Sequence, residues 1–343
     1  MFIRQATTGP KPELREKICP SPSNKLRSLL SRILCRSRMT NLFELENVTK
    51  TYGRVTALRD LSIDVPVGSI GLLGPNGAGK TTMIRTLLGL INIDGGRGTV
   101  LGMDIRDQQL NIRQSVGFVP EDECLFPAVV GIEFVAYAGE LVGMSRKDSM
   151  QRAHEVLDYV GLGEARYRPV ESYSTGMKQR LKLASAIVHD PRLLILDEPT
   201  NGMDPAGRQD ILELSRDLAH NKEMSLLFSS HLLPDVEAVC DYVMVLGNGR
   251  LLANGLIQDL KQAHDHIYEL RTKNDQDGFA RYLNSAGCPT ESKDGCLLVT
   301  IPPDRNQGLL WRAAHESGHQ IRFLRPRRST LEEVFLAAVS EPN

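Results

Sequence analysis

The sequence contains no apolar run that approaches the roughly 18 residues needed to span a bilayer, although the chain is 343 residues long. Its mean hydropathy is −0.22. We therefore expect a chain that does not cross a membrane by itself. At about 150 residues per domain, the length predicts two domains, or three small ones.

Clustered cysteines and a surplus of basic charge are also missing. The six cysteines stand far apart, with no CxxC pair and no spacing typical of a zinc site, so we expect reduced thiols in a cytoplasmic protein. The 41 basic and 42 acidic residues give a net charge of −1. Proteins that bind nucleic acid by bulk electrostatics carry a basic excess, and we therefore expect no nucleic-acid partner.

The near-neutral charge hides a basic tail. Residues 1–38 hold nine Lys and Arg against two Glu, a local charge of +7, which leaves −8 on the remainder. Within the tail, five apolar residues recur at the spacing of one helix face: Leu26, Leu29, Leu30, Ile33 and Leu34. This segment is either a membrane-surface helix, a disordered tail, or untranslated sequence upstream of a true start at Met39.

From residue 41 the pattern is mixed α/β. Apolar residues alternate over 43–48 and 61–65, which predicts the half-buried strands of an antiparallel layer. A continuous apolar run at 193–196 is typical of a strand buried on both faces of a parallel sheet, and a second such strand is expected at 225–229. The Asn-Gly pair at 248–249 predicts a hairpin between residues 242–246 and 250–252.

A separate alternation begins at about residue 264. Strands are expected at 267–270, 296–301 and 321–324, and helices at 278–285, 307–316 and 330–339. This order predicts a small α+β accessory domain over residues 264–343.

Residues 74–81 read GPNGAGKT, the GxxxxGK[ST] pattern of a phosphate-binding loop, between an apolar strand at 70–73 and a helical pattern at 81–90. Glycines allow successive N–H groups to curve around an anion, and the helix N-terminus adds its positive dipole end. We expect Lys80 to reach the β- and γ-phosphates and the Thr81 hydroxyl to bind Mg²⁺. The predicted nucleotide-binding residues here are Gly74, Asn76, Gly77, Gly79, Lys80, Thr81 and Thr82.

A second signal is the acidic pair Asp197 and Glu198 at the end of an apolar strand. Consecutive strand residues point to opposite faces, so both carboxylates serve one site only where the strand ends. Asp197 fits a carboxylate on the Mg²⁺ side, and Glu198 fits a base that polarises water. Alone, such a pair would be read as a helix cap; together with the phosphate loop it predicts nucleotide hydrolysis.

Three further segments, in the right order along the chain, resemble the ATPase subunits of ABC transporters. Residues 173–180 (YSTGMKQR) are similar to the family's signature, and residues 199–205 (PTNGMDP) are similar to its dimer-contact loop. His231 follows the next strand, as the family's switch histidine does, and Tyr52 looks like the aromatic residue that stacks on adenine. The resemblance covers about residues 42–260.

The resemblance implies an α/β fold: a RecA-like P-loop NTPase core with an antiparallel β layer, in an ATPase domain over 41–260 whose helical subdomain spans about 122–189. It also implies a head-to-tail dimer of identical or paired ATPase subunits. Each ATP would lie between the phosphate loop of one subunit and the signature helix of the other. Ser174 and Gly176 would hold the γ-phosphate from across the dimer, and Asp204 would communicate between subunits. His231 would contact the γ-phosphate and orient Glu198 and water.

Four features depart from the family pattern. Glu121 stands where glutamine is commoner; its carboxylate can still meet Mg²⁺ or water, so we keep it as a nucleotide and metal residue. Tyr173, Thr175 and Met177 replace the signature's commoner leucine, glycine and glutamine, and Met203 replaces leucine in the dimer-contact loop. Residues 68–73 are one residue shorter than usual, which a bend or a shifted register must absorb.

These features imply ATP and Mg²⁺ as cofactors, ATP hydrolysis as the activity, and a separate transmembrane permease as the partner at the cytoplasmic face of the cell membrane. Residues 328–335 (RSTLEEVF) are similar to the tail of exporter-type subunits, so export is the expected direction. Four apolar residues of the helical subdomain either contact the permease or lie in the core: Phe126, Val129, Val130 and Phe134. The residues do not encode the cargo.

Two other readings remain. A soluble ABC-type ATPase that acts on ribosomes or DNA would be expected to have tandem phosphate loops or long coiled-coil arms, and this chain has one loop and too few residues between Lys80 and Ser174 for such arms. A P-loop kinase would have no use for the signature segment or for His231.

Overall fold

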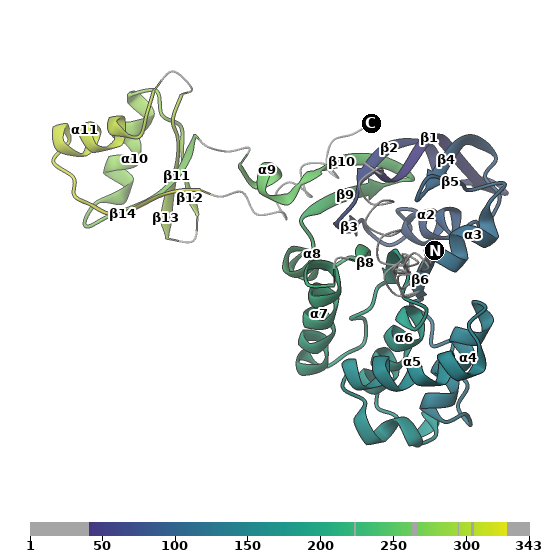
Figure 1. The fold of residues 1–343 in the computed structure, drawn as a ribbon. Coiled ribbons are helices and arrows are strands. Elements are labelled where there is room, and N and C mark those ends of the chain that lie inside the picture. The colour runs from purple at the N-terminus through teal and green to yellow at the C-terminus, as the bar shows by residue number, and fades with distance from the viewer. Residues whose placement is uncertain (1–40, 223, 263–265, 294, 303–304, 328–343) are drawn as a thin grey trace, which may run out of the picture. The chain divides into compact units, whose positions relative to one another are not determined.

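The computed structural model describes residues 41–222, 224–262, 266–293, 295–302 and 305–327. The basic segment 1–38 and the helix predicted at 330–339 lie outside these ranges. Figure 1 shows the helices and strands with the labels used below.

The first layer is an antiparallel sheet, as the alternating pattern predicts, and its strand order is β2-β1-β4-β5. Leu45 on β1 pairs with Ile63 on β2, and both side chains are buried. The adjacent pair, Glu44 and Asp64, faces solvent. The strands are β1 (Asn41–Tyr52), β2 (Val55–Pro66), β4 (Gly95–Val100) and β5 (Met103–Asp104).

The second layer is a six-stranded sheet in the order β10-β9-β3-β8-β7-β6. Every residue of β3, β7 and β8 is buried, which explains the apolar residues at the centres of these strands. The strands are β3 (Ser69–Leu73), β6 (Val116–Val119), β7 (Leu193–Asp197), β8 (Ser225–Ser230), β9 (Tyr242–Gly247) and β10 (Arg250–Leu256).

Only the pairing of β9 with β10 is antiparallel in this second sheet, and it forms the hairpin that the Asn-Gly pair predicts. The short segment before the phosphate loop causes no shift in register, because Ser69–Leu73 pairs with β8 without interruption. Gly68 lies in the turn just before it, with a φ of 139° that favours glycine.

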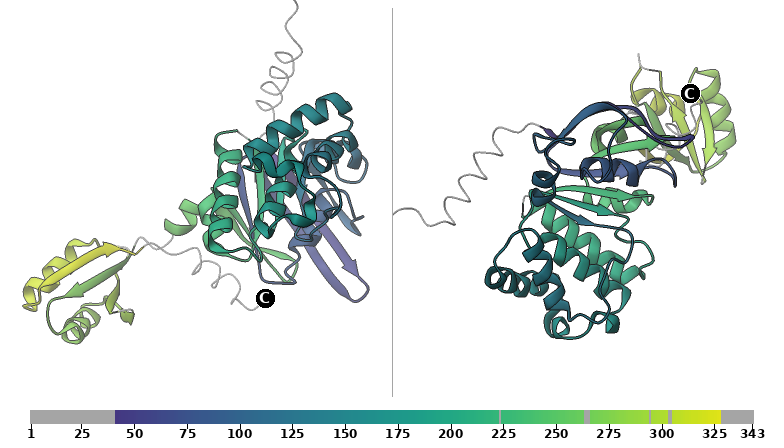
Figure 2. Two further views of the ribbon diagram at one scale, coloured as in Figure 1. Left: turned by 90° about the horizontal axis from the view of Figure 1, so that it is seen from below. Right: turned by 90° about the vertical axis from the view of Figure 1, so that its right-hand side faces the viewer.

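The helical subdomain is inserted between β6 and β7 and lies at the end of the body away from the antiparallel sheet (Figures 1 and 2). Its apolar side chains join those of the central sheet in one hydrophobic cluster, which includes Val135, Leu157 and Leu194. Its elements are α4 (Gly131–Leu141), α5 (Arg146–Tyr159), the 3₁₀ turns η1 (Gly163–Tyr167) and η2 (Val170–Ser172), and α6 (Thr175–Ile187).

The other helices of this body connect the strands. Helix α2 ends at Leu87, earlier than the predicted residue 90, because Gly89 adopts a φ of 61°. The N–H of Leu90 then bonds to the carbonyl of Arg85, which closes the helix in a Schellman-type end. These helices are α2 (Lys80–Leu87), α3 (Gln109–Ser115), α7 (Pro205–His220), α8 (Leu233–Val239) and α9 (Ile257–Gln262).

The residues after 266 form a third sheet with its own hydrophobic cluster, centred on Phe279, Leu283 and Val299. The sheet order β12-β13-β11-β14, with a β-α-β-β-α-β sequence of elements, is that of a ferredoxin-like module. Its strand β12 was not predicted. The elements are β11 (Ile267–Thr272), α10 (Gln276–Ser285), β12 (Thr290–Lys293), β13 (Cys296–Thr300), α11 (Gly308–Glu316) and β14 (Ile321–Pro326).

Candidate functional site

The predicted phosphate loop joins the end of β3 to the start of α2. Gly77 and Gly79 have φ values of 79° and 105°, a region that glycine adopts without strain. A Cβ atom on Gly79 would lie 2.6 Å from the carbonyl oxygen of Ala57, so only glycine fits against β2. No side chain caps α2. Its first N–H groups are therefore available to an anion, which is the chemistry expected of a phosphate site.

A pocket of about 1060 Å³ surrounds this loop. It extends from the loop to Glu121, Glu198 and His231 on one side, and to β2 and the β9–β10 turn on the other. The sequence-predicted residues that line it are Asn76, Gly77, Gly79, Lys80, Thr81, Thr82, Glu121, Glu198 and His231. Gly74 is not among the lining residues, but its carbonyl oxygen accepts a hydrogen bond from Lys80 Nζ at 2.8 Å.

Glu198 lies between two nitrogen-bearing side chains. One carboxylate oxygen is 3.3 Å from Lys80 Nζ, and the other is 2.8 Å from His231 Nδ1. The Glu198 backbone has a φ of 48°, in the left-handed region that non-glycine residues seldom adopt. Such backbone strain is concentrated at functional sites. The turn at the end of β7 directs Glu198 into the pocket.

Asp197, the last residue of β7, is 2% exposed. Thr81 Oγ1 donates a hydrogen bond to its Oδ2 at 3.3 Å, whereas Oδ1 is buried without a partner. Burial raises the pKa of this carboxyl group, and the neighbouring hydroxyls of Ser229 and Thr81 partly oppose the shift. The unpartnered Asp197 oxygen and the neighbouring Thr81 hydroxyl are both oxygen ligands of the kind that Mg²⁺ prefers.

No group of three or more His, Cys, Asp or Glu side chains in the described ranges is arranged to hold a metal by itself. This agrees with the way proteins bind Mg²⁺, which commonly takes one or two protein ligands and completes its shell with substrate phosphates and water. The residues present therefore fit a magnesium ion that arrives with a nucleotide.

Glu121, two residues after the end of β6, is tied to two other elements. Asn201 Nδ2 donates to its Oε1 at 3.0 Å, and Lys182 Nζ donates to the Glu121 and Asp122 carbonyl oxygens at 3.3 and 2.9 Å. Burial lowers the pKa of Lys182. Asn201 also lines the pocket, a role that the sequence reasoning missed because the residue stands outside the acidic pair.

Tyr52 does not line the pocket. Its side chain at the end of β1 is 47% exposed, and the Lys50 ammonium lies 5.4 Å from the ring centre. The far end of the pocket is lined instead by residues that were not predicted: Val55, Thr56, Ala57, Arg59, Asn248 and Arg250. The Asn-Gly signal identified the turn at 248–249 as a hairpin, but nothing local indicated that this turn packs beside the phosphate loop.

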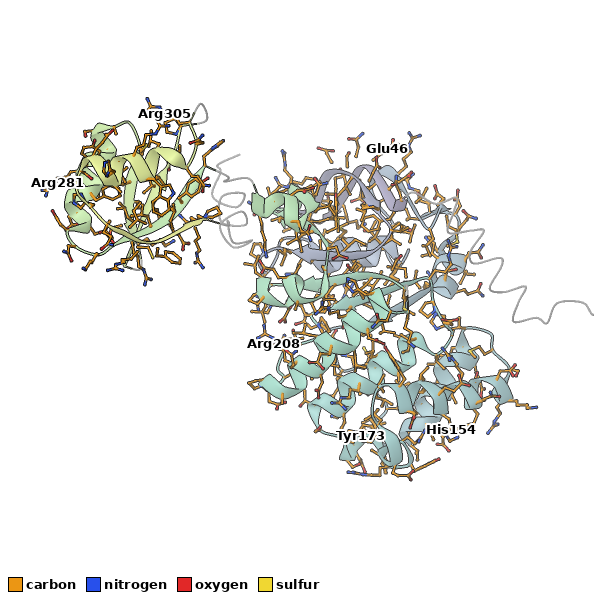
Figure 3. All side chains as sticks on the ribbon, turned by 60° about the vertical axis from the view of Figure 1, so that its left-hand side comes forward. Glu46, His154, Tyr173, Arg208, Arg281 and Arg305 are labelled. Carbon is orange, nitrogen blue, oxygen red and sulfur yellow. The ribbon has the colours of Figure 1, made fainter. Side chains whose placement is uncertain are left out.

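Ser174 and Gly176 lie at the start of α6 and do not line the pocket. The Ser174 hydroxyl accepts a hydrogen bond from the Met177 N–H at 3.3 Å, so Ser174 is an N-cap residue. Its side chain is exposed. Tyr173, labelled in Figure 3, is buried in the helical subdomain, where its hydroxyl donates to the Ala165 carbonyl oxygen at 2.6 Å. Within one chain, the signature residues and the pocket are thus separate.

The apolar residues proposed for a permease contact divide into two kinds. Phe126 is 53% exposed and packs edge-on against Phe134 with ring centres 5.8 Å apart. Val130 and Phe134 are partly buried against the main hydrophobic cluster, and Val129 is also partly buried. None of the described helices combines the length and the apolar character needed to cross a bilayer.

Comparison with known proteins identifies the family. Residues 58–201 match the family model described as ABC transporter. The chain is 38% identical over 300 residues, 87% of its length and 99% of the relative's, to the ABC transporter ATP-binding protein YxlF of Bacillus subtilis. It is 33% identical to the daunorubicin/doxorubicin resistance ATP-binding protein DrrA of Streptomyces peucetius, with 88% of this chain and 94% of that protein covered.

A solved structure shares the fold. CbiO1 of Clostridium perfringens, described as part of the ABC transporter complex cbiONQ, superposes with a TM-score of 0.59 at 26% identity over 65% of this chain and 91% of that one. The phosphate loop, Glu198 and His231 around one pocket, with Asp197 buried beside Thr81, agree with these relationships. The chain belongs to the ATP-binding proteins of ABC transporters, the subunits that hydrolyse ATP to power transport.

Proposed function

We propose that this chain binds Mg²⁺-ATP in the pocket beside the phosphate loop, hydrolyses it in a dimer of ATPase subunits, and drives export through a separate permease at the cytoplasmic face of the membrane. The observation that carries the proposal is the convergence of Lys80, Glu198 and His231 on one pocket. Export is supported by the similarity to DrrA, a drug-resistance protein.

In this proposal, the free N–H groups of α2 and the Lys80 ammonium bind the phosphates. Thr81 and Asp197 would hold the magnesium ion, which would supply charge neutralisation at the phosphates when bound. Glu121 faces the same pocket and contributes a further oxygen ligand to the metal or to water.

Glu198 is the group that accepts a proton from the attacking water. Its carboxylate is already fixed at 2.8 Å from His231 Nδ1, which limits its freedom to turn away. His231 would contact the γ-phosphate with its remaining nitrogen and hold Glu198 in line with the water. Preorganised groups of this kind lower the barrier because they need no rearrangement during the reaction.

Ser174 and Gly176 would complete the site of a second ATPase subunit. Their position outside the pocket of their own chain supports this assignment, as does the exposed N-terminus of α6. Tyr52 would stack on the adenine ring, since it lies on the strand that leads to β2 and remains exposed. Asp204, the N-cap residue of α7, would lie at the subunit contact.

The test is to isolate the full chain from its native membranes with its bound partners. We expect a polytopic membrane protein to co-purify and the complex to hydrolyse ATP only when Mg²⁺ is present. Association with ribosomes instead of a membrane protein would support the soluble ATPase that the sequence left as an alternative. A complex that binds ATP but does not hydrolyse it would contradict the assignment of Glu198 and His231.

A further inference from the structure

The most deeply buried carboxylate outside the pocket is that of Asp235, among the described residues. It lies in the first turn of α8, four residues after His231, and is 1% exposed. Thr200 Oγ1 donates to its Oδ2 at 2.6 Å, and Arg208 Nε donates to its Oδ1 at 2.8 Å. A second Arg208 nitrogen reaches the same oxygen, so the guanidinium binds this carboxylate through two N–H groups.

These bonds join three segments that each adjoin the proposed chemistry. Thr200 is two residues after Glu198, in the loop that leads to α7. Arg208 lies in the first turns of α7 and is labelled in Figure 3. Asp235 follows His231 on the segment that leaves β8. The segments that follow β7 and β8 are therefore linked by the Glu198–His231 bond in the pocket and by the Asp235 bonds behind it. A backbone hydrogen bond from the Glu198 N–H to the Ser229 carbonyl oxygen at 3.0 Å also ties Glu198 to the end of β8.

The link through Asp235 restricts movement more strongly than a surface contact would. A buried carboxylate that loses its partners is left uncompensated in a low-dielectric interior, which is strongly unfavourable. Bonds to charged groups are also shorter and stronger than neutral ones. Neither loop can shift relative to the other without breaking bonds to Asp235.

From this geometry we infer that Asp235 is a positioning residue: it holds the Glu198 loop and the His231 loop at the separation that keeps the carboxylate and the imidazole bonded. The inference rests on the proposed function, because it matters for catalysis only if Glu198 and His231 act as described. Asp235 does not line the pocket and makes no contact with substrate in this role.

The test compares the full-length variants Asp235→Asn and Thr200→Val with Asp217→Asn. The control aspartate lies on α7, where it accepts hydrogen bonds from the Tyr159 hydroxyl and the Asn221 amide, away from the pocket. We expect Asp235→Asn to lower kcat by roughly 10²-fold, the range for a small misplacement of reacting groups. The KM for ATP should change little, and Asp217→Asn should leave both constants unchanged.

If Asp235 acts through His231, a double variant should show it. In a His231→Ala background, Asp235→Asn should cause little additional loss of kcat, because the pair it positions is already broken. An equal loss in both backgrounds, or an unchanged kcat in the single variant, would overturn the inference. If Asp235→Asn does not fold, Thr200→Val removes a single bond to the same carboxylate and must show the same non-additivity with His231→Ala.

The same measurements separate failure of the inference from failure of the proposed function. If Glu198→Gln abolishes hydrolysis but Asp235→Asn turns over normally, the inference alone is wrong. If Glu198→Gln turns over normally, the assignment of the catalytic pair is wrong and the role of Asp235 falls with it.

Discussion

At the scale of single residues, the carboxylate of Glu198 decides whether this pocket is catalytic. It is 8% exposed and is held by Lys80 and His231. Glu198→Gln keeps the shape and a hydrogen-bonding oxygen but removes the base. We expect ATP hydrolysis to fall by roughly 10²–10⁴-fold, the range for losing a general base, while ATP binding persists. Steady-state phosphate release and equilibrium binding of labelled ATP measure the two effects separately.

Glu213→Gln, on the exposed face of α7, is the matched control for this charge change. It should hydrolyse ATP at the rate of the unmodified chain. ATP-bound dimers of the Glu198→Gln protein should accumulate in size-exclusion chromatography, because hydrolysis no longer opens them. Near-normal turnover in Glu198→Gln would remove this residue from the catalytic role.

His189, which follows α6, gives a prediction about pH. Both ring nitrogens are buried, and burial lowers the pKa of the imidazole below its ordinary value of 6.5. Below that pH the unfolded chain binds a proton that the folded chain resists, so the free energy of unfolding should fall as the pH falls. One such group contributes a slope of at most about 1.4 kcal/mol per pH unit.

Urea unfolding of the full chain, at several pH values from about 7.5 down to about 5.5, measures this slope. His189→Leu should reduce the slope, whereas His315→Gln, an exposed histidine on α11, should leave it unchanged. An identical slope in all three proteins would show that His189 does not resist protonation in the fold.

The sequence predicted best those site residues that one local motif fixes. Lys80 and Thr81 follow the loop glycines directly, and Asp197 and Glu198 terminate one strand, so their placement follows from the local geometry of a loop and a strand end. The far wall of the pocket could not be predicted in this way. Arg59 and Arg250 come together because the Gly249 carbonyl oxygen accepts a hydrogen bond from the Arg59 N–H at 2.8 Å, a tertiary contact between two sheets.

At the scale of elements, α6 tests whether the signature serine does more than cap a helix. The hydroxyls of Ser174 and Ser145 each accept a hydrogen bond from the N–H three residues ahead, at 3.3 and 3.2 Å. Replacing either by alanine should therefore cost a similar amount of stability, about 1 kcal/mol. Only Ser174→Ala should also lower ATPase activity, if the hydroxyl contacts the γ-phosphate of a second subunit.

Ser145 begins α5 in the same subdomain and does not line the pocket, so Ser145→Ala is the matched control. Thermal unfolding and ATPase assays of both variants give the comparison. Equal activity in the two proteins would leave Ser174 with a structural role alone.

The end of α2 could be predicted from a local sequence signal, whereas strand β12 could not. Gly89 was present as a stop signal for α2, and its positive φ ends the helix before the apolar pattern does. Strand β12 carried no such signal: its residues, Thr290–Lys293, are all polar and at most partly buried. It forms because β13 offers an edge on which Lys293 pairs with Cys296, which is a property of the sheet rather than of the segment.

At the scale of the whole molecule, the position of the pocket follows from topology. In the sheet, β3 lies between β8 and β9. The chain runs from β3 to β6 at one edge, whereas it runs from the neighbouring β8 to β9 on the opposite side of β3. Ligands in open α/β sheets bind at such switch points, beyond the carboxyl ends of the strands. The phosphate loop, Glu198 and His231 follow the ends of β3, β7 and β8, so the sheet order brings them to the same edge.

This placement yields a prediction for the C-terminal module. Every pocket-lining residue lies between Val55 and Arg250, and the hydrophobic cluster of the module contains residues from 268 to 324 alone. A chain that ends at Lys261 should therefore bind ATP as tightly as the full chain, while dimer stability or coupling to the permease changes. Labelled-ATP binding, together with circular dichroism to verify folding, measures this. A folded shortened chain with collapsed ATP affinity would show that residues after 261 support the pocket, and the proposed boundary at about residue 264 would be wrong.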